Sequence, residues 1–151
     1  MKSFTLMLFF LCLLSCKNDD DSNIDCALFD PFVRNLHIKI VDNSGNNLIE
    51  NETYIAEDIK VRMNGNEYTN VVFKNVETIK NLITLTLFGK NGKNDYEIEL
   101  SNSVIDTLVL DLTLDSTICG INFFTLNTAT YNGNILSIED YNGNYLITVI
   151  K

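Results

Sequence analysis

Cysteine and histidine are the side chains of this sequence with the strongest intrinsic chemistry. The chain has four cysteines and one histidine, at Cys12, Cys16, Cys26, Cys119 and His37. A cysteine activated by a histidine would be a nucleophile, and several such side chains at set spacing would hold zinc. No motif of either kind surrounds these residues, and no hydrolase pattern such as G-x-S-x-G occurs. We therefore expect no enzyme activity, cofactor or metal site, and we expect His37 to be a solvated residue on a strand.

Acidic side chains are the second group with chemistry to offer. The segment DNSGNN, residues 42–47, begins like a calcium loop, but the EF-hand pattern needs glycine at its sixth place and glutamate at its twelfth. This chain has Asn47 and Thr53 at those places, so we expect a turn instead. Looser cation binding stays open for four acids that follow: Glu50, Glu52, Glu57 and Asp58.

The chain begins with a basic residue, Lys2, followed by an apolar run at 4–14 and by a small residue, Ser15. This order is typical of a secretory signal peptide. The apolar run would span only about 16 Å as a helix, which is too short for a hydrocarbon core of about 30 Å. We therefore expect residues 1–15 to be a signal peptide that is removed.

The sequence Leu13-Leu14-Ser15-Cys16 resembles the lipobox of bacterial lipoproteins. In that family the cysteine becomes the first mature residue and carries fatty acyl chains such as palmitate. The resemblance implies that Cys16 is lipidated, and two or three acyl chains would give a stable membrane anchor. The alternative is that Cys16 is one more residue of the apolar segment, like Cys12.

Residues 16–25 are expected to form a solvated tether, since KNDDDSN has nothing to bury. Asp19, Asp20 and Asp21 lie on it, and three carboxylates on a flexible segment repel one another and lack a preorganised metal cage. This acidic run resembles the export signal of Bacteroidetes-type surface lipoproteins. The resemblance implies a protein anchored in the outer membrane and facing outward, with the periplasmic leaflet as the alternative.

The charge balance excludes one class of partner. The chain has 20 acidic and 11 basic side chains and a net charge of −9, so phosphate backbones would repel it and nucleic acid is not expected to bind. The expected partners are the membrane, through the lipid anchor, and an envelope protein or an extracellular ligand.

Two thiols, Cys26 and Cys119, remain once Cys12 leaves with the signal and Cys16 is acylated. Because thiols oxidise outside the cytoplasm, we expect a disulfide between them. It would close a long loop and stabilise the fold by roughly 4 to 5 kcal/mol in the chain-entropy model. Residues 26–151 are expected to form one domain.

Strict alternation of apolar and polar residues dominates from Leu36 onward. Leu36, Ile38 and Ile40 show the period-two signature of a half-buried strand. The pattern recurs in the segments 59–63, 83–87, 96–100, 107–114 and 145–149. No segment has a sustained helical stripe, so we expect very little helix.

Asn-Gly dipeptides between these runs supply the two positive φ values of a type I′ turn. They predict hairpins over 59–74, 82–101 and 123–138, around Asn64-Gly65, Asn91-Gly92 and Asn132-Gly133 respectively. The segment 46–58 has no clean period and is expected to be a long loop. Seven or eight such strands predict an all-β, antiparallel β-sandwich of immunoglobulin-like architecture, with a small β-barrel as the alternative.

The motif Tyr-Asn-Gly-Asn occurs twice, at 131–134 and 141–144. If both copies are turns, residues 135–140 run between them as one strand of about 20 Å. The two turns would then lie at opposite ends of a sheet. We therefore expect each tyrosine to pack across its own hairpin, rather than the two motifs building one binding site.

The stretch DTLVLDLTLDSTICG, with ATYNGN and NYLITVIK after it, resembles the C-terminal half of small Bacteroidetes-type surface lipoproteins. Asp106-Thr107-Leu108 and Asp115-Ser116-Thr117 resemble the O-glycosylation motif of that group, which implies Thr107 and Ser116 as candidate modification sites. We expect a non-enzymatic binding or envelope accessory module. The competing class is an enzyme-inhibitor or enzyme domain with an unrecognised acidic site.

Overall fold

The computed structural model describes residues 25–28, 30 and 32–151. The predicted signal peptide, the lipidated Cys16 and the acidic run Asp19–Asp21 lie outside these described residues. The chain divides between residues 30 and 31 into two units.

The described part of the first unit holds a short turn. The Leu28 N–H donates to the Asp25 carbonyl over 2.9 Å, and the Ala27 N–H donates to the Asp25 carboxylate over 3.0 Å. These residues are exposed. Asp25 therefore ends the predicted tether with a locally hydrogen-bonded turn.

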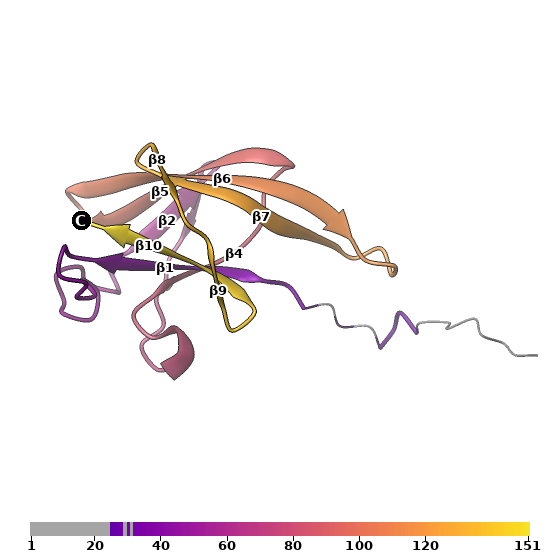
Figure 1. Cartoon of the computed structure of the whole chain (residues 1–151), viewed down its shortest axis with the longest axis horizontal. Coiled ribbons are helices and arrows are strands. Elements are labelled where there is room, and N and C mark those ends of the chain that lie inside the picture. Colours follow the sequence, from indigo (N-terminus) through magenta and orange to yellow (C-terminus); the bar gives the residue numbers. More distant parts are fainter. Residues whose placement is uncertain (1–24, 29, 31) are drawn as a thin grey trace, which may run out of the picture. The chain divides into compact units, whose positions relative to one another are not determined.

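The second unit is a sandwich of two sheets, with the strand orders β4-β1-β10-β9 and β3-β2-β5-β6-β7-β8. Figure 1 shows β1 and β10 in one layer, and β5, β6 and β7 in the other. The predicted all-β sandwich is confirmed, and the sheets do not close into a barrel. The strands are β1 (Asn35–Val41), β2 (Lys60–Met63), β3 (Asn66–Tyr68), β4 (Ile83–Thr86), β5 (Gly92–Ser101), β6 (Val104–Ser116), β7 (Asn122–Tyr131), β8 (Asn134–Leu136), β9 (Glu139–Tyr141) and β10 (Asn144–Ile150).

Alternation along the strands directs the apolar side chains into one core. Leu36, Ile38 and Ile40 of β1 are fully buried and share a cluster with Leu108 and Leu110 of β6. The described strands outnumber the seven or eight expected, because β3, β8 and β9 have only three residues each. Such short strands leave too little alternation to be recognised in a sequence.

The strand pair β1 and β10 is parallel, unlike the antiparallel pairs in the rest of the described sheets. Its register runs from Leu36 opposite Tyr145 to Val41 opposite Ile150. The Lys151 N–H continues the pairing by donating to the Val41 carbonyl over 2.9 Å. The first and last strands of the unit are therefore joined side by side.

Two of the three predicted hairpins are confirmed. The turn between β2 and β3 has φ values of 50° at Asn64 and 79° at Gly65, and the turn between β7 and β8 has 47° at Asn132 and 80° at Gly133. Both dipeptides thus have the two positive φ values of a type I′ turn. The β9–β10 connection at Asn142-Gly143 has the same form.

The prediction of a hairpin over 82–101 is wrong. Strand β4 pairs with β1, whereas β5 pairs with β2 and β6, so the two strands lie in different sheets. Asn91 does not take a positive φ, and its side-chain oxygen instead accepts from the Leu114 N–H over 3.0 Å. The chain crosses between the sheets before β5, through Gly89 with a φ of 147°.

The prediction of one strand over 135–140 is also wrong. Strand β8 belongs to the six-stranded sheet and β9 to the four-stranded sheet, and Figure 1 shows the chain crossing between the two layers after β8. Leu136 and Ile138, on either side of the crossing, both pack against the core. Their partial burial fixes the chain at the crossing.

The predicted loop at 46–58 is confirmed, since no named strand lies between β1 and β2. Leu48, Ile49 and Ala56 are buried and fix it to the core. A second loop, between β3 and β4, contains the short 3-10 helix η2 (Glu77–Ile79). In the described part of the chain, no helix has the length and apolar character needed to cross a bilayer.

Candidate functional site

Asp42 organises the turn that follows β1. Its carboxylate accepts hydrogen bonds from the Ser44 N–H at 2.8 Å, from the Asn46 N–H at 2.9 Å and from the Asn46 amide at 2.8 Å. The side-chain hydrogen bond from Asn46 is the main cause that holds the pKa of Asp42 below its ordinary value. The segment therefore forms the expected turn and not a calcium loop. The Asp42 carboxylate is already hydrogen-bonded to residues of its own loop.

Asn47 fixes the next part of the loop from both ends of its amide. Its oxygen accepts from the Ile49 N–H at 2.9 Å and from the Glu50 N–H at 3.3 Å, and its nitrogen donates to the Asn81 carbonyl at 3.0 Å. These bonds tie the loop both to itself and to the segment before β4. Together with the burial of Leu48, these bonds connect this part of the loop to the core.

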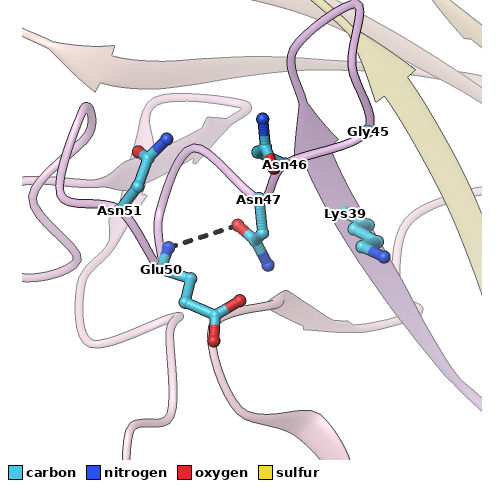
Figure 2. Close-up of a pocket in the computed structure, with 6 residues that line it drawn as sticks. All are labelled: Lys39, Gly45, Asn46, Asn47, Glu50 and Asn51. Atoms are coloured by element: carbon cyan, nitrogen blue, oxygen red, sulfur yellow. Dashed lines mark hydrogen bonds between the residues drawn. The ribbon is translucent and has the colours of Figure 1, made fainter.

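The turn at Asp42 and the part of the loop around Asn47 border a hollow of about 500 Å³. We call it the loop hollow. It is lined by Lys39, Gly45, Asn46, Asn47, Glu50 and Asn51. Figure 2 shows Lys39 on the strand β1, with the other lining residues on the loop beside it. The dashed line in Figure 2 is the bond from the Glu50 N–H to Asn47.

Lys39 and Glu50 are the charged groups of the loop hollow. Among the residues that the structure describes, neither the Lys39 ammonium nor the Glu50 carboxylate has a hydrogen bond or an ion pair. Each side chain is thus available to a ligand, and their charges balance.

A second hollow, of about 250 Å³, shares Glu50 with the loop hollow. Its lining includes Tyr54, Ile55, Lys74 and Lys80. Lys74 pairs with Glu57, with its nitrogen 2.7 Å from one carboxylate oxygen. That hydrogen-bonded pair lowers the pKa of Glu57. The two hollows therefore share one lining residue, Glu50.

No group of three or more His, Cys, Asp or Glu side chains in the described ranges is placed to hold a metal ion. Of the acids considered for loose cation binding, Glu57 is engaged by Lys74, and Glu50 and Glu52 line the second hollow together with two lysines. The geometry gives cation binding no assembled ligand set.

The expectation that His37 is solvated is wrong, because its side chain is 2% exposed. Its Nδ1 lies 3.0 Å from the Thr84 hydroxyl, and the ring of Tyr141 packs edge-on at 5.9 Å between centroids. The Tyr141 hydroxyl in turn donates to the Thr78 carbonyl at 2.8 Å, so η2 and Tyr141 are joined on this face of the sheet. Burial lowers the pKa of His37.

A buried polar network around Asp106 was not expected from the sequence. Asp106 accepts from the Tyr131 hydroxyl at 2.8 Å and from the Asn132 amide at 2.7 Å, and pairs with the Lys151 ammonium. Burial alone would raise the pKa of Asp106, but these partners outweigh it and hold the pKa below its ordinary value. The Tyr131 hydroxyl therefore bonds to β6 and not across the β7–β8 hairpin, and Tyr141 contacts His37 and Thr78 outside the β9–β10 hairpin, so the observed partners of both tyrosines differ from the expected ones. The network around Asp106 joins β6, β7 and Lys151.

The remaining candidate residues lie apart from the loop hollow. Thr107 and Ser116 are exposed on β6, and Ser116 donates to Asn122 at 2.6 Å. Their modification stays a prediction. Cys26 and Cys119 form the predicted disulfide, with Cys119 in the turn between β6 and β7. Comparison with protein-family models, with curated proteins and with solved structures finds no match for this chain.

The loop hollow is the site that sequence reasoning missed. Three of its amides come from one loop, which has no sequence period. Lys39 reaches the hollow from an alternating strand, where it reads as an ordinary outward residue. A run rich in asparagine between two strands was the one available signal.

Proposed function

We propose that this protein is a lipoprotein anchored in the outer membrane through Cys16 and facing outward, where it acts as a non-enzymatic binding or envelope accessory module. The observation that carries the proposal is the lipobox-like Leu13–Cys16 sequence, followed shortly by the acidic run Asp19–Asp21. The disulfide between Cys26 and Cys119 supports export, because such bonds form outside the reducing cytoplasm. The loop hollow offers a place for an extracellular ligand.

The anchor is tested by replacing the expected acyl acceptor. In a host that processes lipoproteins, Cys16→Ser should lose palmitate labelling and leave the membrane fraction. Cys12→Ser is the matched control, because Cys12 lies in the segment expected to be removed, and it should fractionate as the wild type does. Membrane association and labelling that survive in Cys16→Ser would overturn the anchor.

The outward orientation is tested on the acidic run. Replacing Asp19, Asp20 and Asp21 together with alanine should leave acylation intact and make the protein inaccessible to protease on whole cells. Asp25→Ala, which lies beyond the run, should leave accessibility unchanged. If the wild type itself is protected from protease, the protein belongs to the periplasmic leaflet instead.

A further inference from the structure

The charges of the loop hollow favour a neutral ligand. One ammonium, Lys39, and one carboxylate, Glu50, line it, so its own charges cancel. The second hollow adds Glu52 and Lys80, whose charges also cancel, and Lys74, whose charge is paired with Glu57. The whole chain has a net charge of −9, which repels polyanions before they reach the site.

The loop hollow offers both hydrogen-bond donors and hydrogen-bond acceptors. After the internal bonds are made, the Asn46 side chain keeps its oxygen as an acceptor, since its nitrogen donates to Asp42. Asn51 keeps its nitrogen as a donor, since its oxygen accepts from the Thr53 N–H at 3.0 Å. Lys39 adds donors and Glu50 adds acceptors. A hydroxyl group both donates and accepts, so a hydroxyl-rich ligand satisfies this set.

The size and shape of the site point to a chain-like ligand. The loop hollow, at about 500 Å³, falls in the range of about 300 to 1,000 Å³ that small-molecule sites occupy. Glu50 also lines the second hollow of about 250 Å³, where Tyr54 and Ile55 add apolar surface. Because the two hollows share Glu50 as a lining residue, a ligand that occupies both must be longer than one hollow.

We infer that the two hollows together bind a segment of a neutral polysaccharide. The inference rests on the proposed function, because it names the class of extracellular ligand of the binding module. The bonds of Asp42 and Asn47 hold the loop in place before the ligand arrives, so little ordering is needed on binding. One open polar site gives weak binding, but many copies on a membrane raise the avidity for a polymer by about a hundredfold or more.

The test uses the full-length, detergent-solubilised protein in affinity gel electrophoresis. The probes are three neutral polysaccharides, dextran, mannan and xylan, and two charged ones, dextran sulfate and polygalacturonate. At least one neutral polymer should retard the wild type. Glu50→Gln and Asn51→Asp should each weaken that retardation at least fivefold, and Asn51→Asp keeps the oxygen that accepts from Thr53. Glu139→Gln and Asn102→Asp change the same residue types at exposed positions outside the two hollows and should have no effect.

Three outcomes would overturn the inference: no retardation by any neutral polymer, retardation by the charged polymers alone, or equal retardation of wild type, Glu50→Gln and Asn51→Asp. None of these would affect the anchor, which depends on the fractionation of Cys16→Ser. Conversely, retardation of a protein that never associates with membranes would reject the anchor and leave the polysaccharide site standing.

Discussion

His37 is a buried titratable residue whose surroundings offer no partner for a positive charge. Its Nδ1 contacts the Thr84 hydroxyl, Tyr141 packs on its ring, and its Nε2 has no hydrogen-bond partner among the described residues. None of these neighbours is an acid that could stabilise an imidazolium. The folded protein therefore holds the neutral form, in agreement with the lowered pKa.

This predicts a loss of stability in mild acid. The folded pKa lies below the ordinary value of 6.5, so the unfolded chain binds more protons as the pH falls through 6.5. The free energy of unfolding should decrease from pH 7 to pH 5, by at most about 1.4 kcal/mol per pH unit. Asp42, Glu57 and Asp106 have lowered pKa values, and their contributions are lost only at lower pH.

Urea unfolding at several pH values between 7 and 5 measures this dependence. His37→Asn is the control, because asparagine can still hydrogen-bond to Thr84 and does not titrate. Its free energy of unfolding should be nearly constant over this interval. The same slope in both proteins would assign the dependence to another group.

At the scale of the element, the crossing from β4 to β5 depends on Gly89. A Cβ built at this residue would lie 2.3 Å from the side-chain oxygen of Asn94, which is 3% exposed. Asn94 accepts from the Lys90 N–H at 2.9 Å and donates to the Lys90 and Gly92 carbonyls, each at 2.8 Å. Because Gly89 has no side chain, the Asn94 amide fits beside it and hydrogen-bonds to the backbone at the crossing.

Gly89→Ala should therefore lower the free energy of unfolding by roughly 2 to 4 kcal/mol, through backbone strain and the loss of hydrogen bonds of Asn94. Gly65→Ala is the matched control. Its φ is 79° and nothing lies within 4 Å of its Cβ, so only the cost of the left-handed backbone remains, about 1 kcal/mol. Chemical denaturation compares the two variants, and equal losses would show that the contact with Asn94 is unimportant.

The same crossing shows what the sequence could predict. Asn-Gly at 64–65 and 132–133 forms a hairpin because its flanking strands can pair with each other. Asn91-Gly92 has the same two residues, but the preceding strand β4 pairs with β1. The Asn91 side chain accepts a hydrogen bond from the Leu114 N–H instead of forming a hairpin turn. A dipeptide reports local backbone preference, whereas the choice of sheet is made by contacts far away in the chain.

The candidate site was less predictable than the strands. Alternation is a local signal, so most of the core-facing residues of β1, β5, β6 and β10 could be read from the sequence. The loop hollow depends on the bond from Asn47 to Asn81 and on the burial of Leu48, neither of which has a sequence period. His37 alternated outward as expected, but η2 and Tyr141 lie over that face of the sheet and exclude solvent.

At the scale of the whole molecule, the sandwich is held together by pairs of strands and residues that are far apart in sequence. The parallel pairing of β1 with β10 joins the first and last strands of the second unit, and Lys151 reaches Asp106 from the end of β10. Because these contacts join segments that are far apart in sequence, they form only when nearly all of the chain between those segments is present. A covalent link that restricts the conformations of the unfolded chain is therefore expected to have a large effect on the free energy of unfolding.

The disulfide between Cys26 and Cys119 is that link. Because it restricts the unfolded chain over a long loop, replacing both cysteines with serine should lower the free energy of unfolding by roughly 2 to 5 kcal/mol. Thermal unfolding of the folded protein, with and without dithiothreitol, measures the effect. Reduction should bring the melting temperature of the wild type down to that of the double variant and leave the double variant unchanged. Equal melting temperatures of oxidised wild type and double variant would show that the bond adds no stability, and so would leave the core and the buried Asp106 network to hold the fold alone.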